Sequence, residues 1–175
     1  MAQATKKIKT TEKIEKEISK TNSSQNPVVK SLQIQLANSY LLNLNYKHYH
    51  WQTFGPLFRD LHHLFDELAA EVYETTDVLA ERTRMIGQNP LSHFEDFLLE
   101  ATVKPAAKGT DMRGMLSEAR ENLLIVIKEM RDAVKTADEA NDPGTADVFT
   151  RFVQIHEKHE WFLRDMLEKR DGLTS

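Results

Sequence analysis

The chain has 175 residues, 40% of them hydrophobic, which is enough for one domain with a sizeable core. Its formal net charge of −4 gives no general attraction to nucleic acid, and the absence of cysteine excludes disulfides and thiolate metal sites. No run approaches the roughly eighteen apolar residues of a spanning helix, and the beginning of the chain lacks an apolar stretch, so we expect neither a membrane span nor a secretory signal. We therefore place the protein in the cytoplasm, with access to the nucleoid.

The first 25 residues are predicted to form a polar tail, and residues 26–175 a single helical domain. Residues 1–30 hold seven lysines against three glutamates, so the remaining residues carry a net charge of about −8. So few apolar side chains support at most a transient helix in the tail. Repeated over an oligomer, these lysines would give a multivalent, salt-dependent attraction to DNA, which the negative domain opposes.

Four long helices and one short helix are predicted in the domain. Asn26-Pro27 is typical of an N-cap and first helical residue, and Gly87 is typical of a position just beyond a helix. The predicted long helices cover residues 26–53, 57–86, 111–140 and 143–169. The connection between the second and third contains one apolar patch, residues 94–99, which we expect to form a small helix. This pattern predicts an all-α four-helix bundle with one long crossover in the middle.

One face of the second helix carries residues that are typical metal ligands. At about 100° per residue, His62, Asp66, Asp77 and Glu81 project at roughly 0°, 40°, 60° and 100°, so they share a stripe, and His50 lies upstream. Imidazoles with carboxylates suit iron or zinc better than magnesium or calcium. Carboxylates at this spacing are also common on solvated faces. Here apolar residues flank the stripe, which predicts that the stripe is partly dehydrated and binds a partner. The flanking residues are Leu61, Leu64, Phe65, Leu68, Val72, Leu79 and Met85.

The segment Tyr46–Gly87 reads YKHYHWQTFGPLFRDLHHLFDELAAEVYETTDVLAERTRMIG and resembles the signature of the Dps family of mini-ferritins. The resemblance extends over all four long helices, including residues 158–161, and excludes the tail. It implies a ferritin-like four-helix bundle with a short extra helix in the crossover, assembled through twofold dimers into a hollow homododecamer. It also implies a ferroxidase centre with ligands from two subunits. One subunit would supply His50, His62 and Asp66, and its mate Asp77 and Glu81.

An absent motif agrees with a shared centre. Di-iron sites built inside one ferritin-like bundle use Glu and Glu-x-x-His elements on facing helices. No histidine of this chain has a glutamate three residues before it. Two antiparallel copies of the second helix, related by a twofold axis, would instead bring the histidine end of one copy near the carboxylate end of the other.

The chemistry that the resemblance implies is oxidation of Fe(II) at a di-iron centre, with hydrogen peroxide preferred over oxygen, and storage of ferric mineral in the cage. Removal of iron and peroxide would protect DNA from oxidative damage. Hard carboxylate oxygens favour Fe(III) over Fe(II), and Zn(II) suits the same ligands. Trp51 would lie over the centre and intercept stray oxidants, or serve as an ordinary interface aromatic.

Further acidic residues are candidates for the path of iron. In the family, threefold pores lie at the last turn between long helices, where a ring of carboxylates would concentrate Fe(II). The matching acidic residues here are Asp138, Glu139, Asp142 and Asp147. Asp142 precedes Pro143 and is also a good N-cap. On the second helix, mineral nucleation is expected at the residues that adjoin the ligand stripe, unless they are ordinary exposed glutamates: Glu67, Glu71 and Glu74.

Three functions of different class remain open on the residues alone. The first is a ferroxidase and iron-storage cage, which the five-residue ligand set favours. The second is a DNA-compacting protein that acts through its tails, and the third is a regulatory or scaffolding bundle with a solvated polar strip. Structural or solvent-facing roles are favoured over metal binding for the remaining helical histidines: His48, His63, His156 and His159.

Overall fold

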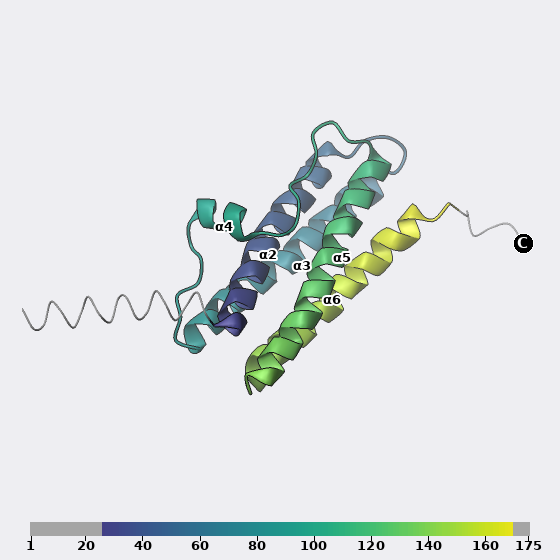
Figure 1. Cartoon of the computed structure of the whole chain (residues 1–175). Coiled ribbons are helices and arrows are strands. Elements are labelled where there is room, and N and C mark those ends of the chain that lie inside the picture. The colour runs from purple at the N-terminus through teal and green to yellow at the C-terminus, as the bar shows by residue number, and fades with distance from the viewer. Residues whose placement is uncertain (1–25, 170–175) are drawn as a thin grey trace, which may run out of the picture.

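The computed structural model describes residues 26–169, and within this range the chain forms helices and no strand (Figure 1). The helices are α2 (Pro27–Gln52), α3 (Phe58–Met85), α4 (Phe94–Glu100), α5 (Met112–Glu139) and α6 (Pro143–Leu167). The all-α prediction is confirmed, and each predicted helix end lies within two residues of the observed one. The lysine-rich tail lies outside the described residues. Among the described helices, none has the length and apolar character that crossing a membrane requires.

Local capping explains where the helices begin and end. The Asn26 side chain accepts hydrogen bonds from the backbone N–H groups of Val28 and Val29, as predicted for an N-cap. Gly87 follows α3 with φ of +83°, a conformation that favours glycine because it lacks a Cβ atom. Asp142 caps α6 by accepting from the N–H of Thr145. These end signals fix the lengths of the long helices.

The long helices pack in antiparallel pairs around one apolar core. Figure 1 shows α2 beside α3 and α5 beside α6, with the crossover running back along the bundle and α4 lying against α2. Aromatic side chains fill the middle of the core. The largest buried ones are Tyr46, Tyr49, Phe65 and Phe149. The apolar stripe of α2 begins with the buried Leu32 and Leu36 and continues with Tyr40 and Leu44. These last two side chains are exposed, by 38% and 46% of their surface.

Three asparagines attach the crossover to the bundle. Asn38 on α2 is fully buried, and its Oδ1 accepts from the backbone N–H groups of Thr102 and Val103. Asn45 and Asn122 bond the backbone of the same segment at residues 104 and 106. Backbone groups that leave regular structure need such partners when they are buried. The crossover is therefore held in one conformation beside α2.

Candidate metal centre

His50 and His62 form a stacked pair at the end of the bundle where α2 turns into α3. Their ring centroids lie 3.6 Å apart with an interplanar angle of 20°, although the residues come from different helices. Phe58, one turn before His62, stacks on the outer side of the pair at 5.0 Å. Both histidines are half-buried. The two imidazoles that the sequence predicted as ligands are thus brought together within a single chain.

Reciprocal hydrogen bonds orient this pair. Nδ1 of His50 lies 2.7 Å from the carbonyl oxygen of His62, and Nδ1 of His62 lies 2.9 Å from the carbonyl oxygen of His50. A carbonyl only accepts, so each Nδ1 carries a proton, and Nε2 is the nitrogen of each ring that can offer a lone pair to a metal. Within residues 26–169, Nε2 of neither ring has a hydrogen-bond partner. Metal-binding histidines are typically held by such a bond from the opposite nitrogen.

Asp66 lies one helical turn beyond His62 and forms an ion pair with Lys47 of α2. The hydrogen bond from Lys47 is the main cause that lowers the pKa of the Asp66 carboxyl, and the Lys47 charge and the two histidines add to it. The carboxylate is therefore ionised at neutral pH. A cation that binds between Asp66 and the histidines would replace the lysine ammonium as its counter-charge. Sequence reasoning missed Lys47, which stands three residues before His50 on the same helix.

Asp77 and Glu81 do not lie near the histidines of their own chain. They follow His62 by fifteen and nineteen residues on the same straight helix, which places them about 22 Å and 28 Å away along its axis. Both carboxylates are exposed, so the expected partial dehydration is not met within one chain. Across residues 26–169, no three His, Asp, Glu or Cys side chains lie close enough together to hold a metal ion. A single chain therefore carries two separate parts of the predicted ligand set.

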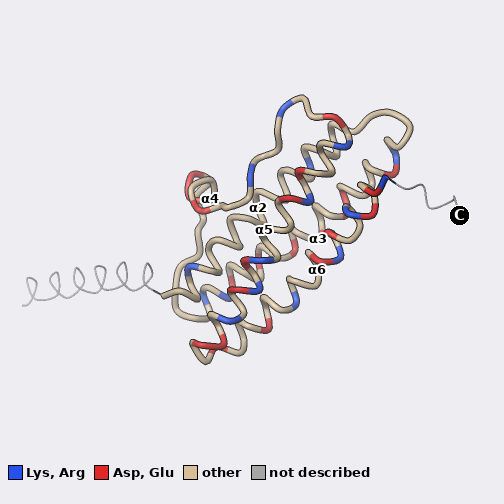
Figure 2. The backbone as a smooth tube through the Cα atoms, turned by 45° about the vertical axis from the view of Figure 1, so that its right-hand side comes forward, with Lys and Arg blue, Asp and Glu red and all other residues tan. Residues whose placement is uncertain are grey.

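The acidic residues predicted around the last turn cluster where α5 leads into α6 (Figure 2). Asp138 and Glu139 are exposed, and Asp147 is exposed while paired with Arg151. Asp142 also has a structural role, because it caps α6 and forms an ion pair with Arg82 of α3.

The predicted nucleation glutamates divide in a similar way. Glu67 and Glu74 are exposed, and no hydrogen bond or ion pair engages either of them within the described part of the chain. Glu71 is held by Lys158 and by Nε2 of His159, both on α6. Two of the three carboxylates therefore lack a partner in this part of the chain, and the third is engaged by α6.

The remaining histidines and Trp51 also differ in environment. His63 is exposed beside His62, and Trp51 is 65% exposed at the end of α2. His156 and His159 are fully buried inside the bundle. For these two, the prediction of a structural role agrees with their burial, and the solvent-facing alternative is wrong.

Comparison with known proteins places this bundle in a family. The model of the ferritin-like domain matches residues 29–172. The chain is 36% identical over 146 residues to a DNA protection during starvation protein of Brevibacillus brevis, covering 83% of this chain and 98% of that one. It is 37% identical over 150 residues to an uncharacterized low temperature-induced protein of Nostoc, covering 85% and 84%.

Solved structures agree with this assignment. Dps from Thermosynechococcus elongatus superposes with a TM-score of 0.84 at 45% identity and covers 90% of this chain and 100% of that one. Dps from Staphylococcus aureus superposes with a TM-score of 0.81 at 32% identity, covering 83% and 98%. The chain therefore belongs to the ferritin-like proteins and, among them, to the Dps family.

Proposed function

We propose that this protein oxidises Fe(II) at centres shared between two subunits and stores the ferric product in a homododecameric cage. The observation that carries the proposal is the His50–His62 pair, whose mutual hydrogen bonds leave two Nε2 atoms without a partner within residues 26–169 and close enough to Asp66 to act on its carboxylate electrostatically. This is half of a ligand set for a transition metal. The other half, Asp77 and Glu81, lies exposed farther along the same helix.

A twofold axis would complete the centre. If α3 of a second copy lies antiparallel to the first, its Asp77 and Glu81 approach the histidines, and the same contact repeats at the other end. Each dimer would therefore contain two equivalent centres, each with two imidazoles and three carboxylates. A scaffolding bundle has no need for an oriented pair of unpartnered imidazole nitrogens.

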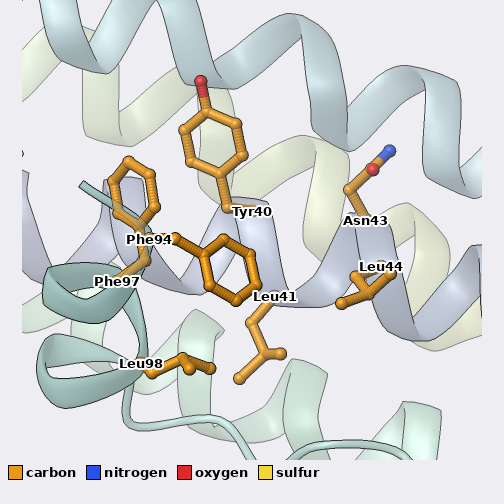
Figure 3. A pocket seen from close by; sticks show the side chains of 7 residues that line it. All are labelled: Tyr40, Leu41, Asn43, Leu44, Phe94, Phe97 and Leu98. Atoms are coloured by element: carbon orange, nitrogen blue, oxygen red, sulfur yellow. The ribbon is translucent and has the colours of Figure 1, made fainter. Parts of the chain in front are cut away.

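An exposed apolar groove supports a second copy on this face. Figure 3 shows the groove between α2 and α4, lined by Tyr40, Leu41, Asn43, Leu44, Phe94, Phe97 and Leu98. Tyr40 stacks on Phe97 at 4.5 Å and meets Tyr73 of α3 edge-on at 6.5 Å. Tyr73 lies one turn before Asp77, so the groove adjoins the carboxylate half of the ligand stripe. A partner that covers these side chains would bury apolar surface and dehydrate the centre together.

The proposed reaction uses Fe(II) as substrate. Two Fe(II) ions give one electron each to hydrogen peroxide, whose O–O bond breaks, and hydrolysis then yields ferric oxyhydroxide and protons. Because both electrons are taken at one centre, no hydroxyl radical is released. His50 and His62 hold the incoming ion, and the carboxylates stabilise the Fe(III) product. Oxygen is the slower oxidant, and Zn(II) would occupy the same ligands without turnover.

Iron would enter through threefold pores at the α5–α6 turn. Asp138, Glu139 and Asp147 are exposed there, and three copies around an axis would focus a negative potential. We assign Asp142 a minor part in attracting Fe(II) to the pore, since Arg82 offsets its negative charge. Glu67 and Glu74 are the proposed sites where mineral begins to grow.

Names of relatives support the same function. A Dps from Vibrio cholerae, 28% identical with a TM-score of 0.77, is described as one of the ferritin-like diiron-carboxylate proteins. Another relative, from Deinococcus radiodurans, is named for DNA protection during starvation. We propose that protection here follows mainly from removal of Fe(II) and peroxide, with a cytoplasmic location.

Mixing of two variants tests the shared centre. One variant carries His50→Ala and His62→Ala, the other Asp77→Ala and Glu81→Ala, and each homogeneous cage should lose fast peroxide-driven oxidation after anaerobic Fe(II) loading. When the two chains are refolded together in equal amounts, half of the dimers are mixed, and each has one intact centre of two. About one quarter of wild-type activity should then return.

The mixed cages also separate this proposal from an internal centre. A centre within one subunit would never recover, because every chain carries a lesion in its own site. Absence of activity in cages that mass measurement shows to contain both chains would therefore refute the shared centre. Wild-type cages that consume neither peroxide nor Fe(II) would refute the ferroxidase function itself.

A further inference from the structure

A second group of polar side chains lies inside the bundle. His156 and His159 on α6 and Tyr46 on α2 are each fully buried. The Tyr46 hydroxyl, both ring nitrogens of His156 and Nδ1 of His159 have no hydrogen-bond partner among the described residues. Native proteins rarely leave buried polar atoms unpaired, so this group indicates an enclosed ligand or water. It shares no hydrogen bond or ring contact with the His50–His62 pair within residues 26–169.

The spacing of the two imidazoles fits one metal ion between them. His156 and His159 stand three residues apart on one face of α6, with ring centroids 6.0 Å apart and an interplanar angle of 84°. Two imidazoles that share an ion at a metal–nitrogen length of about 2.0–2.1 Å have centroids roughly 5–6 Å apart. The Tyr46 ring lies edge-on to His159 at 6.4 Å.

Glu71 prepares His159 for such a role. Its Oε2 lies 3.0 Å from Nε2 of His159, so that nitrogen donates its proton to the carboxylate and Nδ1 keeps the lone pair. Lys158 binds the same carboxylate and keeps it in place. A carboxylate behind a histidine is the usual arrangement that orients a metal ligand. Burial lowers the pKa of His156 to about 3 and also lowers that of His159, so both rings are neutral.

We propose that His156 and His159 form a structural site for a divalent transition metal such as Zn(II) or Co(II), separate from the shared centre. Tyr46 and an enclosed water would complete the coordination, while Glu71 acts behind His159 and does not bind the ion itself. Two nitrogen ligands select against Mg(II) and Ca(II), which prefer all-oxygen sites. The bound ion would link α2 to α6, and the Glu71–His159 hydrogen bond would connect α3 to the site.

Co(II) is the probe, because its visible absorption reports tetrahedral nitrogen ligation. The assembled full-length protein carries His50→Ala and His62→Ala so that the shared centre cannot contribute. After loading and desalting, this protein should retain roughly one Co(II) per subunit with a tetrahedral spectrum. Adding His156→Leu or His159→Leu should remove both signals. The exposed His93→Ala is the matched control and should change neither.

Two conservative variants cover the case in which a leucine variant fails to fold. Tyr46→Phe and Glu71→Gln keep the shape of the core, and each should weaken Co(II) binding severalfold while circular dichroism stays unchanged. The proposal is overturned if the parent protein retains no Co(II) after desalting, because the buried nitrogens then bind water only. It is equally overturned if retained Co(II) is octahedral and unaffected by Tyr46→Phe and Glu71→Gln.

Discussion

Replacement of Asn38 by leucine should release the crossover from the bundle. Asn38→Leu keeps the approximate size of the side chain but removes the Oδ1 that accepts from the N–H groups of Thr102 at 2.8 Å and Val103 at 3.2 Å. Val103 is buried at 4% exposure, so its N–H would stay unpaired at a cost of about 1–3 kcal/mol. Thr102 is exposed and its N–H can turn to water, which adds about 0.5–1 kcal/mol.

The total of about 1.5–4 kcal/mol applies locally, so amide hydrogen exchange is the appropriate assay. At a tenfold change per about 1.4 kcal/mol, exchange at Val103 should accelerate roughly 10- to 700-fold. The central amides of α5 should change much less. Because the same segment carries α4 and its half of the apolar groove, the variant should also assemble less completely, as measured by the mass of the cage.

A substitution on the same helix provides the control. The Gln33 side chain donates one exposed hydrogen bond to the carbonyl of Asn89 at 3.3 Å, so Gln33→Leu should alter exchange by less than about threefold. If Val103 exchanges at the wild-type rate in Asn38→Leu, the asparagine does not hold the crossover, and the two backbone hydrogen bonds that its Oδ1 accepts add nothing measurable to the local stability of this segment.

Three other changes have definite expected outcomes. Asp142→Ala removes the α6 cap and should cost about 1–2 kcal/mol. Burial opposes ionisation of Asp142, but hydrogen bonds from Thr145 and Arg82 outweigh this effect and lower its pKa. The melting temperature of the variant should therefore differ most from that of the wild type near neutral pH, and the difference should shrink as the pH falls below about 4. Asp138→Asn with Asp147→Asn should slow iron oxidation at low Fe(II) and reduce its dependence on ionic strength, and equal initial rates across Fe(II) concentrations would exclude this turn as the route of iron. Deletion of residues 1–25 should abolish weak, salt-sensitive DNA binding in a gel-retardation assay, and unchanged retardation would show that the tail is not responsible.

The sequence by itself determined the local structure of this protein. The Asn26-Pro27 start, the glycine after α3 and the Asp142-Pro143 start act through hydrogen bonds within a few residues, so helix ends could be predicted closely. The angular positions of His62, Asp66, Asp77 and Glu81 also follow from helix geometry alone. The family resemblance of the segment that contains them is confirmed by the comparisons.

Tertiary structure decided which of these side chains meet. Three contacts depend on how separate segments pack against one another: the stacking of His50 on His62, the Lys47–Asp66 ion pair, and the anchoring of the crossover by Asn38. The exposure of individual side chains also depends on tertiary packing. Tyr40 continues the apolar stripe of Leu32 and Leu36, yet it is partly exposed in the groove beside α4.

The buried histidines of α6 illustrate the reason. A sequence pattern places His156 and His159 on one helix face, but it does not state whether that face meets solvent or the core. Only the packing of the other helices against α6 removes these rings from bulk solvent, and α3 sets Glu71 behind one of them. Periodicity encodes direction around a helix, whereas burial and partner choice depend on the side chains that neighbouring helices bring to the same point.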